Sequence, residues 1–218
     1  MPVHRLTRQV AFPDPSLAEP DGLLAVGGDL SPERLVAAYA LGIFPWFSDG
    51  TPILWWSPDP RLVLLPTELH VPRSLARTLR RGAFTFTADR AFEEVMRRCA
   101  EVPRPGQDGT WITDGMVQAY VRLHRLGLAH SFEAWEGATL AGGLYGVSLG
   151  SAFFGESMFS ARPDASKAAF VRSVEWLAGR GVDLVDCQVR TDHLVRFGAR
   201  EVPRPEFLER LAPPLARP

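Results

Sequence analysis

The amino-acid sequence predicts an α+β protein in which helices pack on a mixed, mostly antiparallel sheet. Strand-like and helix-like segments do not alternate strictly along the chain, which argues against a purely parallel sheet. Three strand-like runs, at 130–135, 140–147 and 151–158, follow one another directly. Glu136-Gly137 supplies a tight turn between the first two. With 218 residues, 46% of them hydrophobic, the chain is long enough for one large domain or two small ones.

Residues 1–60 are rich in proline, glycine and tryptophan and are predicted to form a small N-terminal α/β domain. Ser31 is placed to cap a helix that Pro32 begins, because proline suits the first helical position. A short strand at 53–57 is stopped by the prolines that follow. We therefore expect a boundary near Arg61, with 61–218 as the second domain.

The second domain is predicted to hold most of the regular structure. Its expected strands are 62–65, 84–87, 130–135, 140–147, 151–158 and 182–189, and its expected helices are 74–81, 91–99, a helix capped by Asp114, 167–177, 193–197 and 204–211. Glycines follow several of these helices, as is typical of helix ends.

The composition and the motifs exclude several classes of function. The formal net charge of −1 means that a nucleic-acid partner must be held by a local patch. Two cysteines cannot form a disulfide framework, and the five histidines lack metal-ligand spacing, so no metal site is predicted. Phosphate-loop, dinucleotide-binding and nucleophile-turn motifs are missing. The start shows no signal-peptide pattern and no apolar run approaches 18 residues, so we expect a cytoplasmic protein without a membrane span.

Polar side chains inside apolar runs are the first candidates for chemistry. Asp186 and Gln188 are two apart on an expected strand, so they should project from the same face, with Val185 and Cys187 facing the core. A carboxylate beside an amide can orient an amine and help to remove its proton. Glu156 follows a glycine inside an aromatic strand, which suggests a β-bulge or a close backbone approach. For all three polar residues, a buried structural network is the alternative. A thiol nucleophile formed by Cys187 with His193 has only weak support.

Aromatic and basic residues suggest a nucleic-acid ligand. Trp46 and Trp111 lie in Pro/Gly surroundings, where an indole ring can line a cleft and stack on a base. Arginines share one exposed helix face with no acidic residue between them, and guanidinium groups suit phosphates. These arginines are Arg73, Arg77, Arg80 and Arg81. A merely solvated helix face is the alternative.

Taken together, the motifs closely resemble the leucyl/phenylalanyl-tRNA–protein transferase family of bacteria. The matching segments occur in the family's order over nearly the whole chain. They are 21–32, 42–46, 54–61, 109–112, 142–146, 155–160, 165–167 and 186–188. Each segment alone is weak evidence for the family, but the whole set in this order is highly specific for it. Asp21 departs from the expected asparagine at a turn where both residues work.

The resemblance implies an aminoacyltransferase that takes Leu or Phe, sometimes Met, from aminoacyl-tRNA. It implies an acceptor protein beginning with Arg or Lys, and a product marked for degradation by the N-degron pathway. The family's second domain is acetyltransferase-like (GNAT-type). No metal or soluble cofactor is expected, because the tRNA ester carries the activation energy. A monomer is the default expectation.

The resemblance also implies residue roles. Asp186 and Gln188 would orient the attacking amine and draw off its proton, unless the tRNA ribose hydroxyl shuttles that proton, and Glu156 would hold the amino-acid end of the donor. The side-chain pocket and the terminal adenosine would be contacted by Trp46, Trp111, Phe153, Tyr120, Met158 and, more weakly, Tyr39. The arginine face would bind acceptor-stem phosphates. The preference between Leu and Phe stays open.

Two other functions remain as alternatives at this stage. An acyl-CoA-dependent N-acetyltransferase would need a glycine-rich turn leading into a helix to hold pyrophosphate. Residues 142–150 have the glycines, but their pattern is that of two strands. A non-catalytic RNA-binding module would use only the arginine face and the exposed tryptophans.

Overall fold

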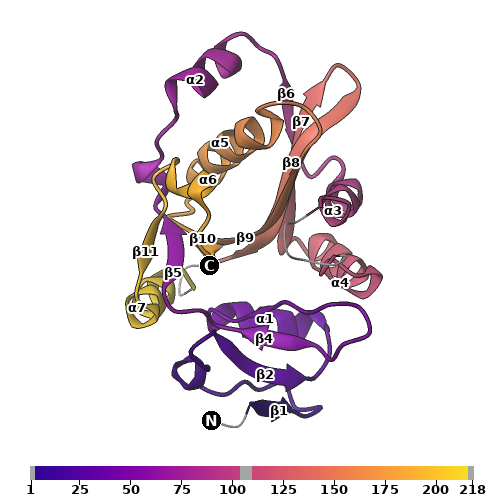
Figure 1. The fold of residues 1–218 in the computed structure, drawn as a ribbon, viewed down its shortest axis with the longest axis vertical. Helices are drawn as coiled ribbons and strands as arrows, with labels where there is room; N and C mark the ends of the chain where they lie inside the picture. The colour runs from indigo at the N-terminus through magenta and orange to yellow at the C-terminus, as the bar shows by residue number, and fades with distance from the viewer. Residues whose placement is uncertain (1–2, 104–109, 216–218) are drawn as a thin grey trace.

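The computed structural model describes residues 3–103 and 110–215. Residue 109, the first residue of one family-like segment, lies outside them. The described chain forms two sheets, a four-stranded one from the N-terminal part and a seven-stranded one from the rest (Figure 1). The predicted α+β class is therefore confirmed. Among the described residues, no helix is both long and apolar enough to cross a bilayer.

The first sheet has the strand order β1-β2-β4-β3. Its elements are β1 (His4–Leu6), β2 (Leu23–Gly27), β3 (Phe44–Pro45) and β4 (Leu54–Trp56), with η1 (Pro15–Leu17) and α1 (Pro32–Ala40) between them. Helix α1 begins as predicted, because Ser31 Oγ accepts from the Arg34 N–H and Pro32 occupies the first position. Strands β1 and β2 were not predicted, because they are short and flanked by turns.

The second sheet has the order β11-β5-β10-β9-β8-β7-β6. Its strands are β5 (Arg61–Leu64), β6 (Thr85–Ala88), β7 (Ala129–Glu136), β8 (Thr139–Leu149), β9 (Ala152–Ser160), β10 (Leu184–Gln188) and β11 (Arg200–Val202). Only β9 and β10 pair in parallel, and the other neighbours are antiparallel. The mixed, mostly antiparallel sheet is thus as predicted.

Helices cover both faces of this sheet (Figure 1). They are α2 (Arg73–Arg80), α3 (Phe92–Ala100), α4 (Asp114–Arg125), α5 (Ala165–Ala178), α6 (Asp192–Val195) and α7 (Arg204–Leu215), with η2 (Pro66–Glu68) before α2. Helices α3 and α4 lie on one face, whereas α5, α6 and α2 lie on the other. One expected cap was wrong: Thr113, not Asp114, caps α4, because its hydroxyl accepts from the Met116 N–H.

One of the two clusters of buried hydrophobic side chains contains residues of both sheets. Tyr39 on α1 packs against Phe154 on β9, with 5.1 Å between the ring centroids. The same cluster of buried side chains runs from Leu24 in the first sheet to Leu211 in α7. Whether residues 1–60 and 61–218 are separate domains therefore stays a prediction, because burial alone does not divide them.

Strands β9 and β10 separate beyond their last paired residues, Phe154 and Asp186. On the other side of β9, the register against β8 shifts between Gly155 and Ser157, which leaves Glu156 as the extra residue of a β-bulge. The bulge expected from the glycine is thus present. A parallel pair that opens in this way leaves room between its strands for a ligand.

Candidate active site

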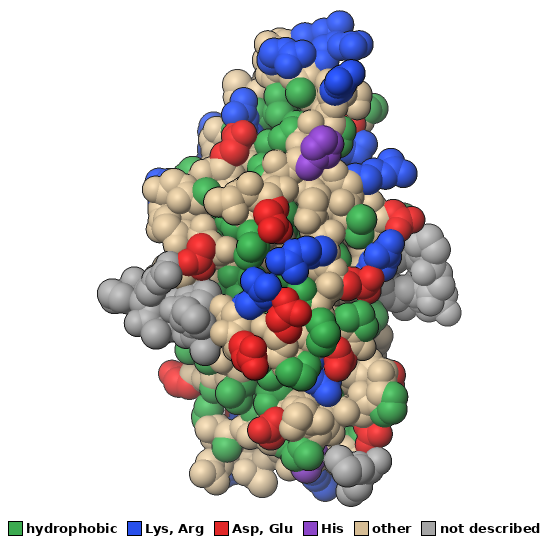
Figure 2. Space-filling view, turned by 90° about the vertical axis from the view of Figure 1, so that its left-hand side faces the viewer, with side chains coloured by type: hydrophobic (Ala, Val, Ile, Leu, Met, Phe, Trp, Pro, Cys, Tyr) green, Lys and Arg blue, Asp and Glu red, His purple; other side chains and the backbone are tan. Residues whose placement is uncertain are grey.

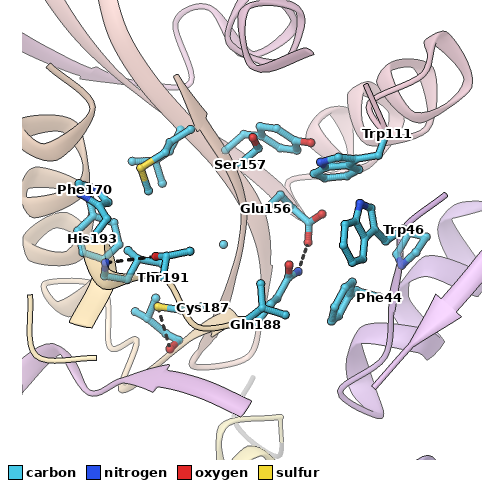
Figure 3. Close-up of a pocket in the computed structure, with 18 residues that line it drawn as sticks. Phe44, Trp46, Trp111, Glu156, Ser157, Phe170, Cys187, Gln188, Thr191 and His193 are labelled. Atoms are coloured by element: carbon cyan, nitrogen blue, oxygen red, sulfur yellow. Dashed lines mark hydrogen bonds between the residues drawn. The ribbon is translucent and has the colours of Figure 1, made fainter. Parts of the chain in front are cut away.

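A cavity of about 420 Å³ lies where β9 and β10 separate. Its size is in the usual range for sites that take small molecules. The lining residues are Phe44, Pro45, Trp46, Trp111, Leu144, Tyr145, Gly155, Glu156, Ser157, Met158, Phe170, Val185, Cys187, Gln188, Val189, Thr191, His193 and Leu194. Figure 3 shows Glu156 and Gln188 between an aromatic group, Phe44, Trp46 and Trp111, and a lobe near Phe170, His193 and Cys187.

Glu156 and Gln188 meet across the opening between the two strands. Gln188 Nε2 donates to Glu156 Oε1 at 2.8 Å (Figure 3). The bulge turns Glu156 out of the regular alternation of β9, and Gln188 has a φ of 62°, in the left-handed region. Both side chains therefore reach the cavity by local departures from ideal strand geometry.

Two tyrosines that lie outside the cavity donate hydrogen bonds to Glu156. Tyr39 Oη donates to Glu156 Oε1 at 2.7 Å, and Tyr120 Oη donates to Oε2 at 3.2 Å, while the two hydroxyls also contact each other. Burial, with the nearby Glu156 charge, raises the pKa of both tyrosines well above 10, so both hydroxyls stay neutral donors. Tyr39 and Tyr120 were expected in the pocket wall, but both rings are fully buried and neither lines the cavity.

The carboxyl group of Glu156 titrates near neutrality. Burial raises its pKa from 4.5 to about 7, because removal from water disfavours the charged form. Hydrogen bonds from Tyr39, Tyr120 and Gln188 stabilise the carboxylate and oppose this rise, while the Asp186 charge adds to it. A carboxyl group poised in this range can serve either as a hydrogen-bond acceptor or as a proton carrier.

This shifted pKa predicts a pH-dependent difference in stability between the wild type and Glu156→Gln. Between pH 4.5 and about 7 the native state holds a proton that the unfolded state has released, so raising the pH destabilises the wild type. The free energy of unfolding should fall relative to the variant by at most about 3 kcal/mol. Urea unfolding of both proteins from pH 4 to 8 measures this. A difference that does not change with pH would contradict the shift.

Asp186 does not line the cavity, and the predicted shared face with Gln188 was wrong. Asp186 is fully buried and accepts two hydrogen bonds from Arg61, Nε to Oδ1 at 2.8 Å and Nη2 to Oδ2 at 2.6 Å. Asp186 Oδ1 also accepts from the backbone N–H of Gln188 at 2.8 Å. A register shift after Asp186 breaks the alternation of β10, so Val185 and Cys187 border the cavity, although they were expected only in the core.

The residues expected in the apolar wall lie partly around the cavity and partly in the core. Trp46, Trp111 and Met158 line the cavity, and Trp46 stands at its mouth with 42% of its surface exposed. Phe153 does not line it, because its ring is packed against Phe132 in the core. Several apolar lining residues come from separate elements and were not predicted from the sequence. These are Phe44, Leu144, Phe170 and Leu194.

Cys187 and His193 both border the cavity, but they do not form an activated thiol. Burial raises the pKa of the Cys187 thiol far above its usual value, so the sulfur stays protonated. Burial, with the charges of Lys167 and Arg196, lowers the pKa of His193, so its imidazole is neutral. Among the described residues, His193 Nε2 has no hydrogen-bond partner. The thiol-nucleophile alternative therefore finds no support.

A second, more open hollow adjoins the cavity and shares Met158 and His193 with it. Asp164 and Lys167 also border it, and Thr78 of α2 donates to Asp164 at 3.4 Å. The predicted basic face is on this helix, and all its arginines are exposed. Figure 2 shows basic side chains gathered at the end of the molecule where α2 lies. The hollow thus lies between α2 and the cavity.

Other chemistries gain no support from the described residues. They contain no group of three or more His, Cys, Asp or Glu side chains that could hold a metal ion. Residues 142–149 belong to β8, and Gly150 lies in the turn to β9, so no helix begins there to bind pyrophosphate. Gly146 serves packing instead, since a Cβ there would lie 2.2 Å from Phe154 O.

The described residues thus form an α+β fold with a carboxyl–amide pair in a largely apolar cavity, and the adjoining hollow leads toward a helix with exposed arginines. Sequence comparison gives the family. The model of the leucyl/phenylalanyl-tRNA protein transferase matches residues 63–212, and that of its N-terminal domain matches residues 28–59. The chain belongs to the leucyl/phenylalanyl-tRNA protein transferase family, and it is an aminoacyltransferase.

Relatives from other bacteria match over the full length. The leucyl/phenylalanyl-tRNA–protein transferase of Anaeromyxobacter sp. (strain K) is 77% identical over 218 residues, covering 100% of this chain and 94% of the relative. The protein of that name from Myxococcus xanthus (strain DK1622) is 58% identical, with the same shares covered. A solved GCN5-related N-acetyltransferase from Kribbella flavida aligns with 11% identity and a TM-score of 0.42, over 79% of this chain and 61% of that one. A likeness this distant does not establish a shared activity.

Proposed function

We propose that this aminoacyltransferase moves Leu or Phe, sometimes Met, from aminoacyl-tRNA to the α-amine of proteins that begin with Arg or Lys. The observation that carries the proposal is the Glu156–Gln188 pair on the wall of an otherwise largely apolar cavity. An apolar side chain fits such a cavity, and the polar pair fits the amino group beside the ester. The product would be marked for degradation by the N-degron pathway.

The cavity offers separate places for the two ends of the donor. Trp46 and Trp111 lie on one side of Glu156, where they can stack on the terminal adenine (Figure 3). On the other side, an apolar lobe suits the Leu or Phe side chain. Its members are Leu144, Met158, Phe170, Val185 and Leu194. The ester carbon would then lie beside Glu156 and Gln188, between the two ends.

The reaction needs positioning and one proton transfer. The acceptor amine attacks the ester carbonyl carbon, the C–N bond forms, and the C–O bond to the ribose breaks. The amine loses a proton and the ribose oxygen gains one, so no external reagent is required. Glu156 would hold the donor's amino group, and the side-chain oxygen of Gln188, left free by the Nε2 hydrogen bond, would orient the attacking amine. Asp186 would act indirectly through its hydrogen bond with the Gln188 backbone, because it does not reach the cavity.

The exposed face of α2 would hold the acceptor stem. Its arginines have no hydrogen-bond or ion-pair partner within the described ranges, so they are available to phosphates. The hollow bordered by Lys167 and His193 offers a route from α2 to the cavity for the single-stranded 3′ end. The proposed unit is a monomer.

Arg80→Ala should weaken tRNA binding and reduce the salt dependence of the affinity. Each lost phosphate contact lowers the slope of log K against log salt by about 0.7–0.9. Fluorescence titration with tRNA at several salt concentrations measures this slope. Arg125→Ala, an exposed arginine on α4, is the matched control and should leave the slope unchanged. An unchanged slope for Arg80→Ala would show that Arg80 does not contact tRNA phosphates and that the tRNA site lies elsewhere.

Met158→Ala should change the transfer of Leu and Phe by different factors, because Met158 forms part of the apolar lobe. One or two methylene groups in such a pocket change discrimination by roughly 10–200-fold. The ratio of kcat/KM for Leu-tRNA and Phe-tRNA is the measurement. Phe153→Ala is the contrast, since that core ring should affect stability but leave the ratio unchanged. Equal losses for both donors in Met158→Ala would contradict the pocket assignment.

The function itself is tested by mixing the protein with Phe-tRNA and an Arg-initiated peptide. We expect an N-terminally phenylalanylated peptide, and none with a peptide that begins with Asp. Acetylation from acetyl-CoA, or tRNA binding without transfer, would replace the proposal by one of its alternatives.

A further inference from the structure

A fully buried arginine lies directly behind the cavity, and no motif of the sequence analysis singled it out for chemistry. Arg61 is the first residue of β5, at the point where the first sheet passes into the second. Its side chain is fully buried, as is that of Asp186. The two form a bidentate pair with distances of 2.8 and 2.6 Å, the geometry in which a guanidinium orients a carboxylate best.

The pair is connected to the cavity through Gln188. Asp186 Oδ1, which accepts from Arg61 Nε, also accepts from the Gln188 backbone N–H at 2.8 Å. Gln188 has a φ of 62°, a conformation that residues other than glycine rarely adopt without support. The oriented carboxylate supplies that support. It thereby directs the Gln188 side chain toward Glu156 Oε1, which it reaches at 2.8 Å.

Arg61 also contacts one wall of the cavity directly. Its guanidinium carbon lies 4.9 Å from the ring centroid of Phe44, which lines the cavity, and 4.7 Å from that of Phe207 on α7. The two rings also flank a group whose Nη1 has no hydrogen-bond partner among the described residues. Helix α7 therefore closes the rear of the site through Phe207.

A gain in folding stability does not explain why Arg61 and Asp186 form a buried ion pair. A buried ion pair is often no more stable than apolar residues of similar volume, because both charges lose their water. Unlike an apolar pair, the ion pair fixes the orientation of the Asp186 carboxylate. Two parallel hydrogen bonds from Arg61 and a third from the Gln188 backbone hold it. We propose that Arg61 is a positioning residue for aminoacyl transfer, which holds Asp186 so that Gln188 presents its amide to the reacting groups. This inference rests on the proposed function.

The test uses Arg61→Lys, which keeps the charge and the buried position but replaces the fork by a single ammonium. Arg34→Lys is the matched control. Arg34 is another fully buried arginine with unpartnered guanidinium nitrogens, but its partners are Asp29 and the carbonyls of Thr7 and Arg8, outside the cavity. Three quantities are measured: kcat and KM for Phe transfer to an Arg-initiated peptide, melting temperature, and the exchange rate of the Gln188 backbone amide by NMR.

For Arg61→Lys we expect kcat to fall about tenfold with KM for aminoacyl-tRNA within about twofold, because misplaced groups lose rate more than binding. The Gln188 amide should exchange about tenfold faster, since its acceptor is no longer held. Arg34→Lys should lower the melting temperature without changing kcat or that exchange rate. The inference would be overturned if Arg61→Lys kept the wild-type values of kcat and of the Gln188 amide exchange rate. It would also be overturned if Arg61→Lys and Arg34→Lys lost kcat equally. Absence of transfer by the wild type would instead refute the proposed function, while the exchange rates would still report whether Arg61 holds Gln188.

Discussion

Glu156→Gln is expected to lower kcat/KM for aminoacyl transfer by about a hundredfold, a loss typical of a misplaced substrate. Glutamine keeps the shape of the side chain but removes the negative charge that would hold the donor's amino group. In the wild type, kcat/KM should rise as pH increases through about 7, because deprotonation creates the active carboxylate. The variant should keep only the rise that comes from deprotonation of the acceptor α-amine, whose pKa is about 7.7–8.0, so the ratio of wild-type to variant kcat/KM should increase through about pH 7. Transfer from Phe-tRNA between pH 6 and 8.5 measures both effects.

A fully buried glutamate outside the cavity provides the control for this substitution. Glu133 on β7 is fully buried and accepts from hydroxyl groups of Thr87 and Ser131, but it does not line the cavity. Glu133→Gln should leave kcat/KM within about twofold, since its charge is remote from the reacting groups. A ratio of wild-type to variant kcat/KM that does not change across pH 7 would remove Glu156 from the proposed role even if its substitution lowered the rate.

Asp186→Ala should reduce both transfer and stability. The alternation along an ideal strand placed the Asp186 side chain beside that of Gln188, but the structure pairs Asp186 with a fully buried Arg61. Removing one partner of a buried ion pair leaves an uncompensated charge and costs about 3–5 kcal/mol. Transfer should fall by at least about tenfold, because Gln188 also loses the acceptor for its backbone N–H. Urea unfolding and single-turnover transfer measure the two effects.

Asp186→Asn separates the two contributions, since its amide oxygen can still accept one hydrogen bond from Arg61 or Gln188. We expect a smaller loss of stability than for alanine. Asp29→Ala is the control, because Asp29 also pairs with a buried arginine but is itself 52% exposed. That change should cost about 1 kcal/mol or less, as is typical of pairs open to water. Wild-type stability of Asp186→Ala would show that the buried pair does not exist in solution.

The helices and most strands follow from local patterns because each pattern acts within a few residues. Ser31 and Pro32 begin α1, and the run of strands from 130 to 158 is joined by short turns, so both were predictable. Strands β1 and β2 were missed, because a short strand among turns owes its existence to a neighbour that pairs with it. Likewise, Gly155 indicated a bulge, but only the pairing with β8 shows that Glu156 is the extra residue.

For the site, the types of residue were predictable from the sequence, but the directions in which their side chains point were not. The sequence by itself determined the family, the α+β class and the polar trio Glu156, Asp186 and Gln188, because ordered motifs and polar groups in apolar runs are visible without coordinates. Only the tertiary structure decided that Asp186 turns away to Arg61 while Gln188 faces the cavity. The physical reason is that a register shift and one left-handed residue reverse the side-chain alternation of β10. Such departures are stabilised by contacts between residues distant in the sequence, here 125 positions apart.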